Sequence, residues 1–323
     1  MKDVTLVITS DFDTHADFIC SRMQETGVQV FRFNTNELDR YEIGLKPDSN
    51  QLTLLDCREQ ESVTETDVRS VWYRRPSSDK KAAEMLDEVG LKFFKGETKE
   101  WIKSITFAFG SAFWVTAPWL LYKARVKPNQ LSVAHEVGLN VPKTLITRDR
   151  RLIETFYHEC ANGVVVKSLK VPFVESEDTY HVLRTQEVTR DDLENPSLYV
   201  CPTIFQEKIS VLHELRIVAI GRHLFAFKAT MKGGRPLDIR SGELGKVEYT
   251  PYSISKDMRD KILGVLNHFN LPFSSMDFLV DQDGKEFFVD LNPNGQWLWL
   301  EFLTGVVMSD MFIEMLRSGK IPD

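Results

Sequence analysis

The first third of the chain alternates short apolar runs with amphipathic stretches. β-Branched and other apolar residues fill 4–9 (VTLVIT) and 28–33 (VQVFRF), and such runs are typical of buried strands. Between them, 17–26 has the pattern of a helix that ends at Gly27. This strand–helix–strand order predicts a small α/β unit. The same patterns predict strands at 52–55 and 68–73 and mainly helix over 80–109.

The rest of the chain combines helices with antiparallel hairpins. Strands predicted at 215–220 and 223–229 flank a glycine-containing turn, which indicates a hairpin. A second hairpin joins 275–280 to 286–291 through Asp281-Gln282-Asp283-Gly284, a sequence suited to a tight reversal. Other predicted elements are helices at 130–137, 152–160, 256–269 and 300–316, strands at 163–168 and 203–209, and a hairpin within the polar stretch 171–195.

Length and composition add that the chain has more than one globular unit. It has 323 residues, of which 42% are hydrophobic and 27% charged. Its net charge of -7 argues against a nucleic-acid surface, which needs a clustered basic excess. The four cysteines (Cys20, Cys57, Cys160 and Cys201) are widely spaced, which disfavours a zinc site or a disulfide framework and suits a reducing cytosol.

Neither a signal peptide nor a membrane span is expected. An acidic residue, Asp3, precedes the first short apolar run, unlike the basic start of a secretory signal, so we expect a cytoplasmic protein. The stretch 104–122 carries no charge, but polar residues interrupt it and Pro118 is expected to break a helix near its end. A buried helix that runs into a loop is therefore favoured over a membrane span.

Three oxygen-bearing side chains are expected to meet in the last hairpin. Asp277 lies in one predicted strand, and Asp290 and Asn292 lie two residues apart near the end of the next, so these two share a face. Each alone would be unremarkable, because Asp and Asn often cap a turn before proline. Together we favour Mg²⁺ ligands, since ionised carboxylates within apolar strands are costly without a partner and hard oxygen ligands suit Mg²⁺ beside substrate phosphates.

Two lysines and an arginine are candidate anion-binding groups. Lys167 follows three valines, so its ammonium needs an anion, for which a phosphate and an internal carboxylate are equally good candidates. Lys127 opens a helix, where a lone lysine is usually a solvated surface group. Arg216 alternates with apolar neighbours, and it either grips a carboxylate or phosphate or forms a surface salt bridge with Glu214 or Glu243.

The segment around Asp238 and Arg240 is a weaker candidate. An acid and a base two residues apart between glycines suit substrate recognition, although a solvated loop is the commoner outcome. The motifs of P-loop enzymes, dinucleotide-binding enzymes, serine hydrolases, zinc proteases and protein kinases are absent from the sequence.

These features, in this order, resemble the ATP-grasp superfamily and, more closely, the microviridin-type graspetide macrocyclases, which form omega-ester and omega-amide bonds in peptides. The second metal carboxylate departs from the family, because Asp290 stands where Glu is usual, and the stretch after Lys167 lacks the glycines of many ATP-grasp phosphate loops. The segments that carry the resemblance are VWYRRP (71–76), KPNQLSVAHEVGLNVPKTL (127–145), VVVKSL (164–169), VTRDDLEN (188–195), CPTIFQEKI (201–209), HELRIVAIG (213–221), LDIR (237–240), SSMDFLV (274–280) and FFVDLNPNGQWLWLE (287–301).

The resemblance implies an α/β (α+β) ATP-grasp fold with three lobes and ATP between two antiparallel sheets. The implied domains are an N-terminal α/β domain (1–125), a central subdomain with a leader-binding hairpin (126–210) and a C-terminal subdomain with the metal site (211–323). The implied site residues are Lys127 and Lys167 at the phosphates, Gln206, Glu207, Lys208 and Ile209 at adenine, Glu214 at ribose, Asp277, Asp290 and Asn292 at Mg²⁺, Arg216 at the transferring phosphoryl group, Asp238 and Arg240 at the acceptor carboxylate, and Asp191, Asp192 and Asn195 at the leader peptide.

The implied activity is ATP-dependent macrocyclisation of a ribosomally made precursor peptide. An Asp or Glu side chain becomes an acyl phosphate, and a Ser or Thr hydroxyl or a Lys amine then attacks it to give an ester or amide. The resemblance also implies a homodimer, with no nucleic-acid or membrane partner. Two rival functions stay open, namely a small-molecule ATP-grasp carboxylate–amine ligase and a peptide-binding protein with a degenerate ATP site.

Overall fold

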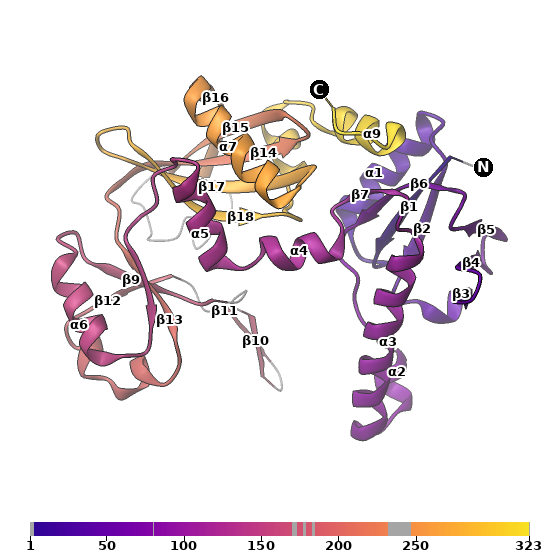
Figure 1. The fold of residues 1–323 in the computed structure, drawn as a ribbon, viewed down its shortest axis with the longest axis horizontal. Helices are drawn as coiled ribbons and strands as arrows, with labels where there is room; N and C mark the ends of the chain where they lie inside the picture. The colour runs from indigo at the N-terminus through magenta and orange to yellow at the C-terminus, as the bar shows by residue number, and fades with distance from the viewer. Residues whose placement is uncertain are drawn as a thin grey trace.

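The computed structural model describes residues 3–79, 81–169, 173–176, 179–182, 185–231 and 247–322. In Figure 1 the N-terminal lobe lies at one side, a large sheet from the last third lies centrally, and a smaller sheet lies at the far side. Helix α4 (Pro118–Ala124) connects the N-terminal lobe to the rest, and α9 (Ser309–Ser318) returns to pack on that lobe.

The N-terminal lobe is built on a parallel sheet with the strand order β2-β1-β6-β7. All six residues of β1 are buried, which explains its unbroken apolar run. Helix α1 begins after Asp13, whose carboxylate accepts from the amides of His15 and Ala16 and so caps the first turn. The elements are β1 (Val4–Thr9), α1 (Thr14–Glu25), β2 (Val30–Asn34), β6 (Val68–Tyr73) and β7 (Phe113–Val115).

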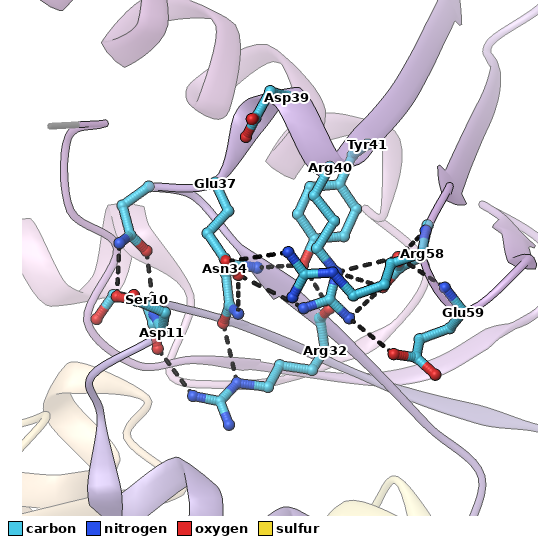
Figure 2. Close-up of polar contacts among 12 residues, drawn as sticks. Ser10, Asp11, Arg32, Asn34, Glu37, Asp39, Arg40, Tyr41, Arg58 and Glu59 are labelled. Carbon is cyan, nitrogen blue, oxygen red and sulfur yellow. Dashed lines mark hydrogen bonds and ion pairs between the residues drawn. The ribbon is translucent and has the colours of Figure 1, made fainter. Parts of the chain in front are cut away.

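A second, antiparallel sheet and two helices complete this lobe. Arg40 lies just before the antiparallel sheet and is bound to it, because its guanidinium donates to the carboxylate of Asp56 at 2.6 to 3.0 Å. Figure 2 shows Arg40 in a network that also contains Arg32, Asn34 and Glu37. The elements are η1 (Leu38–Arg40), β3 (Tyr41–Lys46), β4 (Gln51–Asp56), β5 (Glu61–Thr64), α2 (Lys81–Met85) and α3 (Glu88–Ala108).

The smaller sheet has the order β12-β9-β13-β8, and its described pairs are antiparallel. Helix α6 covers it through Ile153, which packs with Phe205 and Val164. The hairpin predicted within 171–195 is present as β10 and β11. The elements are α5 (Lys127–Glu136), β8 (Thr144–Thr147), α6 (Arg150–Glu159), β9 (Val164–Lys167), β10 (Phe173–Ser176), β11 (Thr179–Val182), β12 (Gln186–Val188), η2 (Asp192–Glu194), η3 (Pro196–Tyr199) and β13 (Thr203–Glu207).

The large sheet has the antiparallel order β16-β15-β14-β17-β18. Helix α7 packs on one face; Ser255 caps its first turn, and it ends at Asn270 in the left-handed region (φ 53°). The elements are β14 (Val211–Ile220), β15 (His223–Met231), β16 (Val247–Tyr252), α7 (Lys256–Phe269), β17 (Phe273–Asp281), β18 (Glu286–Asn292), α8 (Leu298–Thr304) and α9.

The two faces of the large sheet are covered differently. One face packs its apolar side chains against α5 and α7, with Ile217, Phe278 and Phe288 among the buried residues. On the other face, Val218 and Phe227 are buried in the core that contains α1, α8 and α9. The polar side chains further along this second face are only partly buried, and they form the site described below.

Two sequence predictions about helix boundaries are wrong. The predicted single helix over 300–316 is two helices, because Gly305 adopts a left-handed conformation (φ 72°) that ends α8. Pro118 does not end a helix but is the first residue of α4, a position at which proline's missing N–H costs nothing. The uncharged stretch 104–122 is thus divided among α3, β7 and α4, and among the described residues no helix is long and apolar enough to cross a membrane.

His15 lies in the interface between the N-terminal lobe and the large sheet. Its ring packs edge-on against Trp297, with centroids 4.9 Å apart, and against Trp72 at 6.0 Å. Burial, with a further contribution from the Arg74 charge, lowers the pKa of His15 to about 3. The side chain is therefore neutral in the folded protein at every pH near neutrality.

This burial predicts a loss of stability in mild acid. Since the folded-state pKa lies below the unfolded value of 6.5, stability is full above pH 6.5 and falls as the unfolded chain takes up a proton. The contribution of His15 to unfolding free energy should fall by about 2 kcal/mol between pH 6.5 and about pH 5. Urea unfolding of wild type and His15→Leu at both pH values measures it; an equal pH dependence of the two proteins would contradict it.

Candidate functional site

The last hairpin brings the predicted carboxylates together. Asp277 of β17 is the register partner of Asp290 of β18, and Ser275 is the partner of Asn292. The strands reverse at 281–285, where Gly284 has a φ of 81° and Asp281 accepts from the amides of Asp283 and Lys285. Directly opposed residues share a face, so the carboxylates and the Asn292 amide lie on one face of the sheet, as predicted.

Arg216 lies beside these carboxylates. It is the register partner of Asp277 on β14, and its Nη1 donates to Asp277 Oδ1 at 2.7 Å. Its Nη2 donates to Ser275 Oγ at 2.8 Å and to the carbonyl oxygen of Gln296 at 3.2 Å. The ion pair described for Arg216 is therefore with an internal carboxylate, Asp277, which was not predicted as its partner, and its side chain is 17% exposed.

Lys127 reaches the same face from another element. It opens α5, and its Nζ donates to Asp290 Oδ1 at 2.7 Å. Gln130, one turn later, fixes α5 against β18, because it donates to the Leu291 carbonyl and accepts from the Leu291 amide. The expectation of a solvated lysine at this position is therefore wrong, since packing of α5 on β18 directs Lys127 into the site.

Lys167 lies on the smaller sheet. Its Nζ donates to Gln206 Oε1 at 2.7 Å, across the pair β9–β13. Gln206 is buried and donates in turn to Thr144 Oγ1. A side-chain amide is therefore one partner of Lys167, which neither of the two sequence-based alternatives included.

A cavity of about 280 Å³ lies where the two sheets meet. The segment that leads from α5 into β8 pairs with β18 nearby, because the Phe288 amide donates to the Asn140 carbonyl at 2.8 Å. Glu207 and Ile209 therefore line the same cavity as the turn of the hairpin that carries Asp277 and Asp290. The lining residues are Asn162, Glu207, Ile209, Ser210, Asp281, Gln282, Asp283 and Phe287.

The other predicted site residues divide into three groups. Lys208 lies beside the cavity and pairs with Glu187 at 2.6 Å, while Glu214 lies on β14 one residue before Leu215. Asp238 and Arg240 lie outside the described residues. The predicted leader-binding residues, Asp191, Asp192 and Asn195, lie together at η2 and η3 on the smaller lobe.

Two of the leader-binding candidates also have local structural roles. Asp192 accepts from the amide and hydroxyl of Thr189, both at 2.7 Å, and the hydroxyl bond holds the pKa of Asp192 below its usual range. Asn195 accepts from the Ser197 amide and caps η3. Asp191 is exposed and makes no side-chain cap, so it is the member of the group whose charge faces solvent.

Sequence reasoning missed the residues that hold Arg216 in place. Ser275 is fully buried, and a Cβ at Gly295 would lie 1.8 Å from its hydroxyl oxygen. Only glycine therefore allows the 293–296 segment to approach Ser275 and Arg216 this closely. The NPNG sequence at 292–295 is the one local signal for such a turn.

The residues present fit a divalent cation that is shared with phosphates. Two carboxylates and one amide oxygen lie on one face, and this set leaves coordination positions for phosphate oxygens and water. Among the described residues, no group of three or more His, Cys, Asp or Glu side chains could hold a metal ion. A metal site made of such side chains alone is therefore not found there. Lys127 and Arg216 flank the carboxylates as positive groups.

Comparisons with known proteins extend over the whole chain. Residues 4–119 match the family model of the MvdD pre-ATP grasp domain. The macrocyclase MdnC of Microcystis aeruginosa MRC, bound with the precursor peptide MdnA, shares 25% identity and a TM-score of 0.85, with 98% of this chain and 99% of that chain covered. A search of curated proteins finds no match.

Two further structures have the same fold. The RiPP-associated ATP-grasp ligase of Chryseobacterium gregarium, in complex with ADP and a leader and core peptide, has a TM-score of 0.86 at 23% identity, covering 98% of this chain and 97% of that chain. The ATP-grasp ligase PsnB, complexed with a phosphomimetic variant of a minimal precursor, Mg and ADP, has a TM-score of 0.78 at 18% identity, covering 99% of both chains.

Proposed function

Since this chain is an ATP-grasp ligase of the macrocyclase type, we propose that it cyclises a ribosomally made precursor peptide through its side chains. ATP and Mg²⁺ are the proposed cofactors. An Asp or Glu side chain of the core peptide is activated as an acyl phosphate and then joined to a Ser or Thr hydroxyl or a Lys amine. The observation that carries the proposal is the row Lys127–Asp290–Asp277–Arg216, on a sheet face beside a cavity between two sheets.

The proposed binding roles come from the family resemblance, and the positions of the described residues support part of them. Glu207 and Ile209 line the cavity, so this strand end, from Gln206 to Ile209, is proposed to hold adenine, with Glu214 at the ribose. Lys127 and Lys167 are proposed to contact phosphates from the two sheets. Asp277, Asp290 and Asn292 are proposed to hold Mg²⁺, which when bound neutralises charge on the phosphate oxygens. Asp238 and Arg240 are proposed to bind the acceptor carboxylate. We also propose domain boundaries at 125/126 and 210/211.

In this reaction the protein positions the reactants and stabilises charge. A carboxylate oxygen of the peptide attacks the γ-phosphorus of ATP, the bond to the bridging oxygen breaks, and ADP leaves. Arg216, which donates to Asp277 and Ser275, is proposed to stabilise the negative charge on the phosphoryl oxygens. The peptide hydroxyl or amine then attacks the acyl carbon and loses its proton, and phosphate leaves with the former carboxylate oxygen.

The proposed test combines the purified enzyme with ATP, Mg²⁺ and the precursor encoded by a small neighbouring reading frame. Each ring removes one water from the peptide and releases one ADP, which mass spectrometry and an ADP assay measure together. Release of ADP only with free amino acids would instead indicate a small-molecule ligase. Peptide binding without ADP release would indicate a degenerate ATP site.

The peptide is the proposed partner, and a homodimer in the cytoplasm is the proposed assembly. Three apolar side chains of α3 could contact a second protein surface, because Val89, Phe93 and Phe107 are 77%, 70% and 70% exposed. Sedimentation velocity of the purified chain measures the assembly directly.

Asp191 is expected to contribute to leader binding. Asp191→Asn removes an exposed charge without removing a helix cap, so the fold should be unaffected. Calorimetry should show about tenfold weaker binding of the isolated leader peptide, the cost of one charged hydrogen bond. Asp48→Asn, in an exposed turn of the N-terminal lobe, is the control. Unchanged affinity in Asp191→Asn would contradict the assignment.

A further inference from the structure

The segment 293–296 links the N-terminal lobe to the proposed metal site. Its backbone carbonyl oxygens accept from three side chains of distant elements. Thr116 Oγ1 donates to Pro293 O at 3.4 Å, Arg74 Nη1 donates to Asn294 O at 2.7 Å, and Arg216 Nη2 donates to Gln296 O at 3.2 Å. Two of these donors, Thr116 and Arg74, belong to the N-terminal lobe, so that lobe determines part of the segment's conformation.

Arg74 and Asn294 hold each other through bonds in both directions. Arg74 Nη1 also lies 3.2 Å from Asn294 Oδ1, and Asn294 Nδ2 donates back to the carbonyl oxygens of Arg74 and Tyr73. Each residue thus satisfies main-chain and side-chain groups of the other. This geometry fixes the amide of Asn294 as well as its backbone.

Arg74 is a costly way to fill an interior position. Its side chain is 1% exposed, and the only carboxylate near it among the described residues is Asp13, 3.4 Å from its Nε. Its Nε and Nη2 have no hydrogen-bond partner among the described residues. A buried guanidinium with so few partners is a net stability cost relative to an apolar side chain, which indicates that its directed bonds to Asn294 serve a purpose besides packing.

The hydrogen bonds that hold Asn294 also affect the position of a proposed metal ligand, Asn292. The backbone N–H of Asn294 donates to Asn292 Oδ1 at 3.1 Å and so orients the oxygen that would face the metal. At the other end of the segment, the Gln296 carbonyl accepts from Arg216, and a Cβ at Gly295 would lie 3.3 Å from Arg216 Nη2. A shift of Asn294 would therefore move Asn292 first and Arg216 second.

We propose that Arg74 is a positioning residue, which orients the metal ligand Asn292 through Asn294 from the N-terminal lobe. The inference rests on the proposed function, because it assigns Asn292 to the metal. With this role for Arg74, the N-terminal lobe contributes to metal binding although it is far along the chain from the metal ligands.

The test measures metal affinity directly rather than catalysis. Arg74→Lys keeps the positive charge and loses the paired geometry to Asn294. Titration of Mn²⁺ into protein saturated with ADP, followed by electron paramagnetic resonance, should show metal affinity about 10- to 100-fold weaker than wild type, the usual cost of removing a group that orients a ligand. The affinity for ADP in a chelator should not change.

Arg40→Lys is the matched control. Arg40 is also a largely buried arginine of the N-terminal lobe with a carboxylate partner, Asp56, and it makes no contact with 293–296. Its variant should lose comparable stability and keep wild-type affinity for Mn²⁺. Equal losses of metal affinity in both variants would show a general structural role and overturn the inference.

The remaining outcomes are also decisive. Wild-type Mn²⁺ affinity in Arg74→Lys would overturn the inference and leave the proposed function intact. Absence of metal-dependent ADP binding in wild type would overturn the proposed function and the inference with it. If Arg74→Lys does not fold, Asn294→Ala replaces it, because this variant removes the bonds back to Tyr73 and Arg74. It should show the same loss of metal affinity, with intact ADP binding in chelator. Wild-type metal affinity in Asn294→Ala would overturn the inference.

Discussion

Replacement of Asp290 by alanine is expected to abolish ATP-dependent ring formation. Asp290 is the register partner of Asp277 and the acceptor for Lys127, so its loss removes a metal oxygen and leaves a lysine unpaired at the site. The turnover rate for water loss from the precursor should fall by about a thousandfold or more, as when a group that stabilises transition-state charge is removed. Mass spectrometry of the peptide with an ADP assay measures the effect.

Two further variants separate chemistry from folding in this experiment. Asp290→Asn keeps the shape of the side chain and removes its charge, and it should be as inactive as Asp290→Ala. Asp260→Ala removes an exposed carboxylate from α7 in the same lobe, whose ion pair among the described residues is with Lys256, and it should retain wild-type turnover. Full ring formation by Asp290→Ala would refute the assignment of Asp290 to the metal.

Replacement of Arg216 by alanine is expected to lower turnover as well, by a smaller factor and for a different reason. The guanidinium contacts Asp277, Ser275 and Gln296 at once, and this fixed position directs it at the face where phosphoryl transfer is proposed. Turnover should fall by about a hundredfold or more, while binding of ADP should change little, because charge stabilisation in the transition state is what is lost. Single-turnover ring formation and calorimetry with ADP measure the two effects separately.

The lysine variant tests whether charge alone is sufficient. Arg216→Lys keeps the charge but cannot make the three contacts of the planar guanidinium, so it should remain well below wild type. Arg222→Ala, at the exposed far end of the same hairpin, should be fully active. Wild-type turnover in Arg216→Ala would show that phosphoryl transfer occurs without this residue.

The sequence alone was sufficient where contacts are local along the chain. Asp277 and Asp290 are separated by one tight reversal, so alternation of side chains and a turn at Asp283-Gly284 predict that they meet. Alternation also predicts that Arg216 faces opposite to Leu215 and Ile217, but the pairing of its strand with the strand of Asp277 was not predicted. Propensity also located β1 and α7, whose observed bounds equal the predicted ones.

The sequence was insufficient where a distant partner decides the outcome. Lys127 reads as a surface residue until α5 packs on β18 and directs it to Asp290. Arg74 and Asn294 are 220 residues apart, so no pattern near either predicts their mutual bonds. Gly305 ends the first of the two helices within 300–316 by adopting a left-handed conformation, which other residues rarely adopt. The presence of a glycine does not by itself predict this conformation.

An isotope experiment tests directly whether a peptide carboxylate is activated by phosphorylation. The precursor is prepared with a heavy oxygen isotope in its Asp and Glu carboxylates and is cyclised with unlabelled ATP. If the carboxylate is phosphorylated, one heavy oxygen per ring should appear in the released phosphate, because the acyl carbon–oxygen bond breaks. Retention of all heavy oxygen in the cyclised peptide, with unlabelled phosphate, would contradict it.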